Sequence, residues 1–164
     1  MSTKLIVLAA LLFAAPLAAA EPEKAAAPDR AALEAKFKED MNGVYLKGYF
    51  TLLGREQKQG LKEEKYTITS VEKLDGDKWL FNVRIQYGTH DATMPLPLDV
   101  QWAGDTPVIT LTDFLVPGFG KFTSRVLFYR GQYAGTWEGG KEPDGSIHGG
   151  NLFGVLEKIE NEKK

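Results

Sequence analysis

The segment from Tyr66 to Tyr87, YTITSVEKLDGDKWLFNVRIQY, decides the fold because it contains two alternating stretches around a tight turn. Asp75-Gly76 is a strong two-residue hairpin signal, and such a turn fixes which residues of the two strands face each other. The predicted partners are Tyr66 with Ile85, Ile68 with Val83, Ser70 with Phe81, and Glu72 with Trp79. Because cross-strand partners lie on one face, the two apolar series coincide in this register and separate after a slip of one residue. Turn chemistry and hydrophobic alternation therefore predict the same antiparallel hairpin.

The same period of two residues recurs on both sides of this hairpin, from Val44 onward. Further strands are predicted at 44–52, 94–102, 108–112, 122–129, 132–138 and 151–158, whereas the polar stretch 54–64 is predicted to be a loop or a solvated strand end. Pro95 and Pro97 indicate a sheet edge or a strand entrance, because proline has no N–H for the ladder. Closing such a meander removes exposed edges, so residues 43–160 predict an all-β domain, a small antiparallel up-and-down barrel of about eight strands.

Residues 29–42 predict one short helix before the sheet. Asp29 is the expected N-cap, and Asn42-Gly43 is the expected stop. The apolar residues of this segment recur every fourth position and share one face: Leu33, Phe37 and Met41. Since this stripe is narrow, the helix is expected to pack lightly or to fray.

Residues 1–20 have the layout of a secretory signal peptide, with Lys4, an apolar run at 5–15 and small residues up to Ala20. The predicted cut lies between Ala20 and Glu21, and residues 21–28 are expected to form a flexible linker. The apolar run is shorter than the roughly 20 residues of a membrane-spanning helix, and no later run reaches that length. We therefore expect a periplasmic or secreted protein with no transmembrane segment in the mature chain.

Composition argues against several functions. The chain has no cysteine, which excludes disulfides, and its formal net charge of -2 with scattered Lys and Arg argues against a nucleic-acid partner. Without cysteine or a Gly-x-Ser-x-Gly turn, nucleophilic catalysis is not expected, and the chain is predicted not to be an enzyme.

Three weaker chemical readings use the histidines and acidic residues. His90-Asp91 could form a base and its orienting acid, but a loop turn is the preferred interpretation. The same pair with His148 could bind a metal, yet no His-x-x-x-His spacing supports this, so no metal and no cofactor are expected. The carboxylates that could face one another across a barrel are Asp99, Asp113 and Glu138.

Large aromatic residues are the candidate ligand-binding set. Most are expected to be core, because large rings dominate burial in β domains. If the interior is not filled, the same rings would line an apolar pocket suited to a small molecule. The candidate residues are Trp79, Phe81, Trp102, Phe114, Phe119, Phe128, Tyr133 and Trp137.

The segment 114–119 has an unusual composition for a loop. Large apolar side chains are crowded around Pro117 and Gly118, where polar turn residues are typical. The preferred interpretation is a loop that folds back and seals one end of the barrel. The alternative is an exposed apolar patch that contacts a ligand, a membrane surface or a protein partner.

The C-terminal third contains three distinctive stretches: Asp113-Phe-Leu-Val-Pro-Gly-Phe-Gly120, Tyr133-Ala-Gly-Thr-Trp137 and His148-Gly-Gly-Asn-Leu-Phe-Gly154. With these stretches it resembles a family of uncharacterised exported bacterial proteins. More loosely, the architecture resembles lipocalin-like and avidin-like barrels, which hold small ligands inside an up-and-down sheet. This second resemblance implies an architecture only. The inward aromatic series and the apolar segment 114–119 are what predict a binding barrel for a small apolar molecule. The alternative is an envelope interaction or structural module with a solid core and a docking loop at 114–119.

Overall fold

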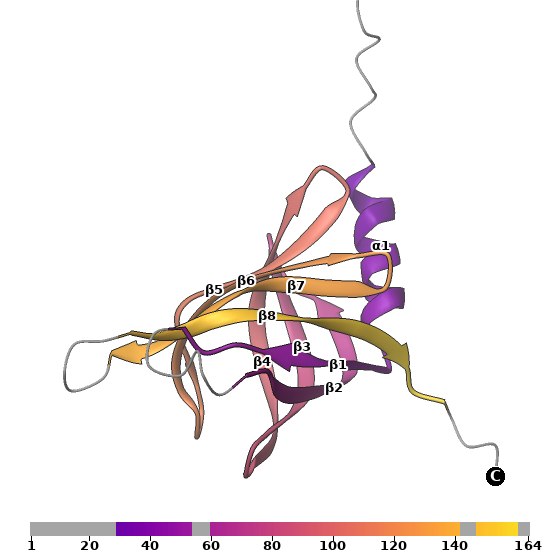
Figure 1. Ribbon diagram of the computed structural model, residues 1–164. Helices are drawn as coiled ribbons and strands as arrows, with labels where there is room; N and C mark the ends of the chain where they lie inside the picture. Colours follow the sequence, from indigo (N-terminus) through magenta and orange to yellow (C-terminus); the bar gives the residue numbers. More distant parts are fainter. Residues whose placement is uncertain (1–28, 54–59, 142–146, 161–164) are drawn as a thin grey trace, which may run out of the picture.

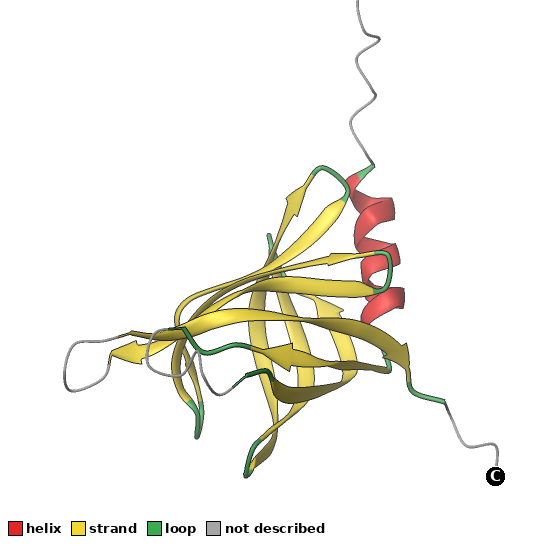
Figure 2. Ribbon diagram, in the orientation of Figure 1, coloured by secondary structure: helices red, strands yellow, loops and turns green. Residues whose placement is uncertain are grey.

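The computed structural model describes residues 29–53, 60–141 and 147–160. A helix, α1 (Arg30–Met41), precedes eight antiparallel strands that close into a barrel (Figures 1 and 2). The strands are β1 (Val44–Phe50), β2 (Lys62–Lys73), β3 (Lys78–Tyr87), β4 (His90–Ala103), β5 (Thr106–Val116), β6 (Gly120–Tyr129), β7 (Gln132–Lys141) and β8 (Ile147–Lys158). The predicted all-β barrel with one preceding helix is confirmed. The predicted signal peptide and linker lie outside the described residues.

Each strand pairs with its successor, and β8 returns to β1 along the whole of β1, from Val44–Lys158 to Phe50–Leu152. Side chains alternate between the two faces of a strand, so one apolar series from every strand points into the barrel. Ile68 and Val83, partners in β2 and β3, are both buried. The outward series is more polar, and the interior is therefore the hydrophobic core.

The hairpin of β2 and β3 follows the predicted register in its far half only. Tyr66 pairs with Ile85 and Ile68 with Val83, as predicted. Near the turn the prediction is wrong by one residue, and the observed pairs are Val71 with Phe81 and Lys73 with Trp79. The Leu74 N–H donates to the Lys78 carbonyl, so the turn spans residues 75–77 and is longer than the predicted Asp75-Gly76. A register shift between Ile68 and Ser70 compensates for this extra residue.

The wall between β4 and β5 is paired along part of its length. Their ladder runs from Ala103–Thr106 to Asp99–Thr110 and does not continue toward His90. The Val100 N–H donates to Asp77 next to β3, so even-numbered residues of β4 direct their N–H groups toward β3. Pro95 and Pro97 are odd-numbered, so their backbone nitrogens point toward β5, where the ladder has ended. The missing N–H of proline therefore removes no hydrogen bond between strands. The edge indicated by these prolines is thus present locally, as a seam within a closed barrel.

No helix in the described part of the chain is long and apolar enough to cross a membrane.

Candidate functional site

The barrel contains a cavity of about 230 Å³ lined by side chains from all eight strands. Most of these side chains are aliphatic or aromatic. The polar side-chain groups among them are the Glu64 carboxyl, the Ser124 hydroxyl, the Trp137 indole N–H and the phenol hydroxyls of Tyr66 and Tyr133. The interior is therefore neither solid nor polar, but an apolar space with a few polar groups in its wall.

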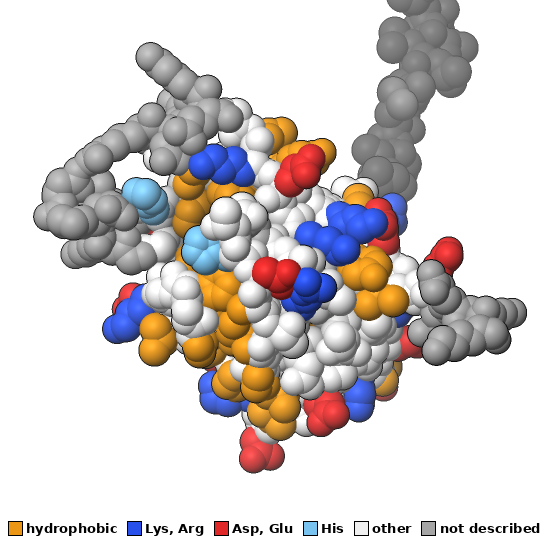
Figure 3. Space-filling model, turned by 90° about the horizontal axis from the view of Figure 1, so that it is seen from below, with side chains coloured by type: hydrophobic (Ala, Val, Ile, Leu, Met, Phe, Trp, Pro, Cys, Tyr) orange, Lys and Arg blue, Asp and Glu red, His pale blue; other side chains and the backbone are white. Residues whose placement is uncertain are grey.

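The cavity reaches the end of the barrel that carries the β3–β4 and β5–β6 turns. There its lining residues Phe50, Phe119, Phe122 and Trp137 are half-buried. Figure 3, which views the molecule from below, shows hydrophobic side chains reaching the surface beside both histidines at this end. This end is the accessible side of the cavity.

The opposite end is closed by α1, through Phe37. Phe37 is 3% exposed and meets four rings edge-on, at centroid distances of 5.2 Å to Trp79, 6.1 Å to Trp102, 6.3 Å to Phe81 and 6.4 Å to Phe128. Met41, one turn later, is also fully buried. The expectation that this helix packs lightly is wrong, because its narrow stripe enters the barrel interior instead of lying on an outer face.

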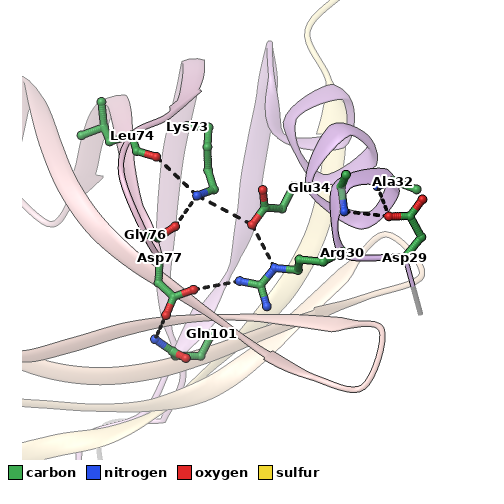
Figure 4. A network of polar contacts seen from close by, with 10 residues as sticks. Asp29, Arg30, Ala32, Glu34, Lys73, Leu74, Gly76, Asp77 and Gln101 are labelled. Atoms are coloured by element: carbon green, nitrogen blue, oxygen red, sulfur yellow. Dashed lines mark hydrogen bonds and ion pairs between the residues drawn. The ribbon is translucent and has the colours of Figure 1, made fainter. Parts of the chain in front are cut away.

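Polar contacts fasten the start of α1 to the turn between β2 and β3 (Figure 4). The Arg30 guanidinium lies 2.9 Å from Glu34 and 2.8 Å from Asp77, and the carboxyl of Asp77 accepts a further bond from Gln101. The Lys73 ammonium lies 3.7 Å from Glu34. At the other end of the helix, the Lys158 ammonium donates hydrogen bonds to three backbone carbonyls of residues 39–42. These bonds give partners to carbonyls that the end of a helix leaves without intrahelical donors.

Glu64 is the carboxyl group in the cavity wall and is 7% exposed. Its Oε2 accepts a hydrogen bond from the Tyr66 hydroxyl at 2.8 Å, and its Oε1 accepts one from the Tyr133 hydroxyl at 3.0 Å. Burial raises the pKa of Glu64, while the two hydrogen bonds lower it by less. Burial and the neighbouring Glu64 raise the pKa of Tyr133, so Tyr133 remains a hydrogen-bond donor.

Two inward-facing glycines let Tyr133 reach Glu64 across the sheet. Tyr133 pairs with Gly154 of β8, Gly154 pairs with Gly48 of β1, and Gly48 pairs with Glu64 of β2. A Cβ at Gly48 would lie 2.5 Å from the Tyr133 hydroxyl oxygen, and a Cβ at Gly154 would lie 2.7 Å from the Tyr133 ring. The phenol therefore occupies the space that two side chains would otherwise fill, and it links β7 to β2.

The sequence interpretation missed Glu64 because it lies in the polar stretch 54–64. Strand β2 begins at Lys62, so Glu64 has the same parity as Tyr66 and Ile68 and points inward with them. This alternation with Tyr66 and Ile68 is the sequence signal that could have identified Glu64 as an inward-facing residue. It was overlooked because the polar residues before Glu64 conceal where the strand starts.

Five of the eight predicted ligand-binding residues line the cavity: Phe81, Phe119, Phe128, Tyr133 and Trp137. The other three do not. Trp79 and Trp102 pack around Phe37 at the closed end, and Phe114 packs on the core from a position outside the cavity lining. Contact of any of the eight with a ligand stays a prediction.

The segment 114–119 is half strand and half loop, because residues 117–119 form the turn between β5 and β6. Residues up to Val116 belong to β5, and Phe114 pairs with Phe122 of β6. Val116 and Phe119 line the cavity but leave this end accessible, so the segment does not seal it, and Leu115 is 61% exposed. The segment thus forms one rim of the cavity.

The histidines and the three acidic residues do not assemble into a site in the described residues. His90 and His148 are exposed, and the carboxylate of Asp91 accepts hydrogen bonds from Arg84 and Gln86. No cluster of three or more His, Asp or Glu side chains suited to a metal occurs in the described part of the chain. The residues once considered as facing carboxylates, Asp99, Asp113 and Glu138, are absent from the cavity lining, where Glu64 stands instead.

Comparison with known proteins finds no matching family model, no matching curated protein and no matching solved structure. The cavity and its lining are the features from which a function can be inferred.

Proposed function

We propose that this protein is an exported binding module that holds a small, largely apolar molecule inside its barrel. The observation that carries the proposal is the apolar cavity, which is closed at one end by Phe37 and reaches a half-buried rim at the other. Ligand sites are typically concave and mostly apolar, with a few polar groups that fix orientation. The lining described here, with Glu64 as its one carboxyl, has that composition.

The volume of the cavity limits the size of the ligand. Pockets for drug-sized molecules begin at roughly 300 Å³. A dry cavity of about 150 Å³ admits benzene. A cavity of about 230 Å³ therefore suits a molecule with one or two rings, or a short alkyl chain.

Filling the cavity provides the test. We expect 2-naphthol to bind the purified protein, observed as a change in its fluorescence, and Val126→Phe to weaken this binding at least tenfold because Val126 lines the cavity. Val155→Phe, the same change at an exposed position of β8, is the matched control and should leave the affinity unchanged. Native mass spectrometry after gentle purification adds a search for a co-purified molecule. Equal binding to both variants, or no binding to the parent protein, would overturn the proposal.

The proposal includes export, as expected for the exported bacterial barrels that the C-terminal pattern resembles. The mature protein should begin at Glu21, and intact mass spectrometry of protein secreted or released from the periplasm measures this directly. A mature chain that retains residues 1–20 contradicts it. The alternative, an interaction module with a solid core, is less well supported because the interior contains a cavity; its remaining candidate contact is Leu115.

A further inference from the structure

Glu64 is a buried acid that forms no ion pair with a Lys, Arg or His among the described residues. Its carboxyl oxygens accept hydrogen bonds from Tyr66 and Tyr133, which are neutral donors. Among the described residues that line the cavity there is no Lys, Arg or His. Buried carboxylates are normally paired with a cation, because an isolated charge is costly to remove from water. A cationic ligand in the cavity would therefore form an ion pair with Glu64.

The geometry of the carboxyl leaves room for another donor. A carboxylate offers about four lone-pair sites, and the tyrosines use one on each oxygen. The Tyr133 phenol is held in place by the space above Gly48 and Gly154. The carboxyl is thus oriented by the protein and still able to accept hydrogen bonds from a ligand.

The surrounding rings favour a cation as well. Tyr66 and Tyr133 contact Glu64 directly, and the Phe128 ring lies 6.2 Å from the Tyr133 ring. Aromatic faces attract ammonium groups, most strongly where water is excluded. A carboxylate ligand would instead place two acids together, which disfavours ionisation of both.

We propose that the cavity is a receptor for a small organic cation, a primary amine with one ring or a short alkyl chain, whose ammonium group binds Glu64. This inference rests on the proposed binding function and specifies its ligand class. The apolar walls hold the body of the molecule, and its ammonium supplies the missing countercharge.

Three probes with the same ring and different head groups test the proposal by calorimetry: 2-phenylethylamine, 2-phenylethanol and 3-phenylpropanoate. We expect the amine to bind at least tenfold more tightly than the alcohol, and the carboxylate to bind most weakly. The measurement is made at mildly alkaline pH, where the amine keeps its proton and ordinary carboxyls have lost theirs. This comparison uses the unaltered protein and needs no variant to fold.

Glu64→Gln should lower amine affinity at least tenfold and leave 2-phenylethanol within about twofold, because it removes the charge and keeps the shape. Glu63→Gln is the matched control, since Glu63 is exposed and points away from the cavity. Equal binding of amine and alcohol, or an amine affinity unaffected by Glu64→Gln, overturns the amine proposal while 2-naphthol binding would still support a binding barrel. Failure of 2-naphthol and of all three probes overturns both.

Discussion

At the residue scale, the buried carboxyl of Glu64 couples folding to protonation. Burial raises its pKa in the folded protein above the ordinary value of 4.5, so the folded state holds this proton more tightly than the unfolded state does. Its contribution to stability is therefore fully present below pH 4.5 and is lost as the pH rises through the folded pKa. The groups that face it, Tyr66 and Tyr133, donate hydrogen bonds and carry no charge.

We predict that the parent protein loses free energy of unfolding relative to Glu64→Gln as the pH is raised from 4 toward neutrality. Urea denaturation of both proteins across this range measures the difference, in which the other titrating groups cancel. Glu63→Gln is the matched control, because that side chain is exposed. A parent-minus-Glu64→Gln difference that stays constant with pH would show that Glu64 is not desolvated.

Gly48 is predicted to be intolerant of a side chain. Gly48→Ala places a methyl group 2.5 Å from the Tyr133 hydroxyl and close to the Phe153 carbonyl, so either the phenol or the strand must move. Overpacking of this kind typically costs about 1–3 kcal/mol, and displacement of Tyr133 also removes its hydrogen bond to Glu64. Denaturant unfolding measures the loss. Gly139→Ala is the control, because its new Cβ would meet neighbours at an ordinary 3.7 Å and should change stability little.

At the scale of elements, Phe37 is predicted to account for a large part of the stability that α1 contributes. Phe37→Ala empties the space between Trp79, Trp102, Phe81 and Phe128, and such truncations typically cost about 3–5 kcal/mol. Lys38→Ala changes the adjacent, exposed residue and should shift stability by less than about 0.5 kcal/mol. Urea midpoints of the two variants distinguish these cases. A loss below 1 kcal/mol for Phe37→Ala would mean that the helix is not seated in the barrel.

The elements could largely be predicted from the sequence because strand alternation and turn residues are local signals. The helix at 29–42 and the strand order follow from them, and Ile68 does face Val83. What failed depends on pairing across the sheet. The register shift between Ile68 and Ser70 offsets the extra residue of the three-residue turn. The local sequence at Asp75-Gly76 contains no signal for either feature.

The candidate site was predictable in its aromatic lining and not in its polar centre. Tyr133 and Trp137 were identified because inward aromatic residues are recognisable by parity. Glu64 was not, because its burial depends on Gly48 lying beside it and on Tyr133 crossing two strands, which are contacts between distant parts of the chain. The role of Phe37 in closing one end of the barrel was missed for the same reason, since nothing near Phe37 in the sequence shows that it contacts Trp79.

For the whole molecule, the barrel is asymmetric in two respects. One end is filled by Phe37 while the other is rimmed by half-buried rings, and the β4–β5 ladder covers only part of the length of its two strands. The seam runs toward the accessible end, and Leu96 and Leu111, which line the cavity, belong to the two strands that flank it. The cavity and the partly unpaired seam are therefore neighbours.

Hydrogen exchange should reveal this seam as a difference between alternate amides of β4. Ala92, Met94 and Leu96 direct their N–H groups to β3 and should be protected, whereas Asp91 and Thr93 face the unpaired side and should exchange much faster. NMR-detected exchange resolves these residues individually, and Gln101, which is paired with Val108, is the internal reference for an odd-numbered amide in the closed part of the wall. Protection of Thr93 equal to that of Gln101 would mean that β5 pairs with β4 along its full length in solution. Fast exchange at Asp91 and Thr93, with Gln101 and the even-numbered amides protected, would instead show that the seam is open in solution. Pro95 and Pro97 explain how such an edge is kept free of further strand pairing.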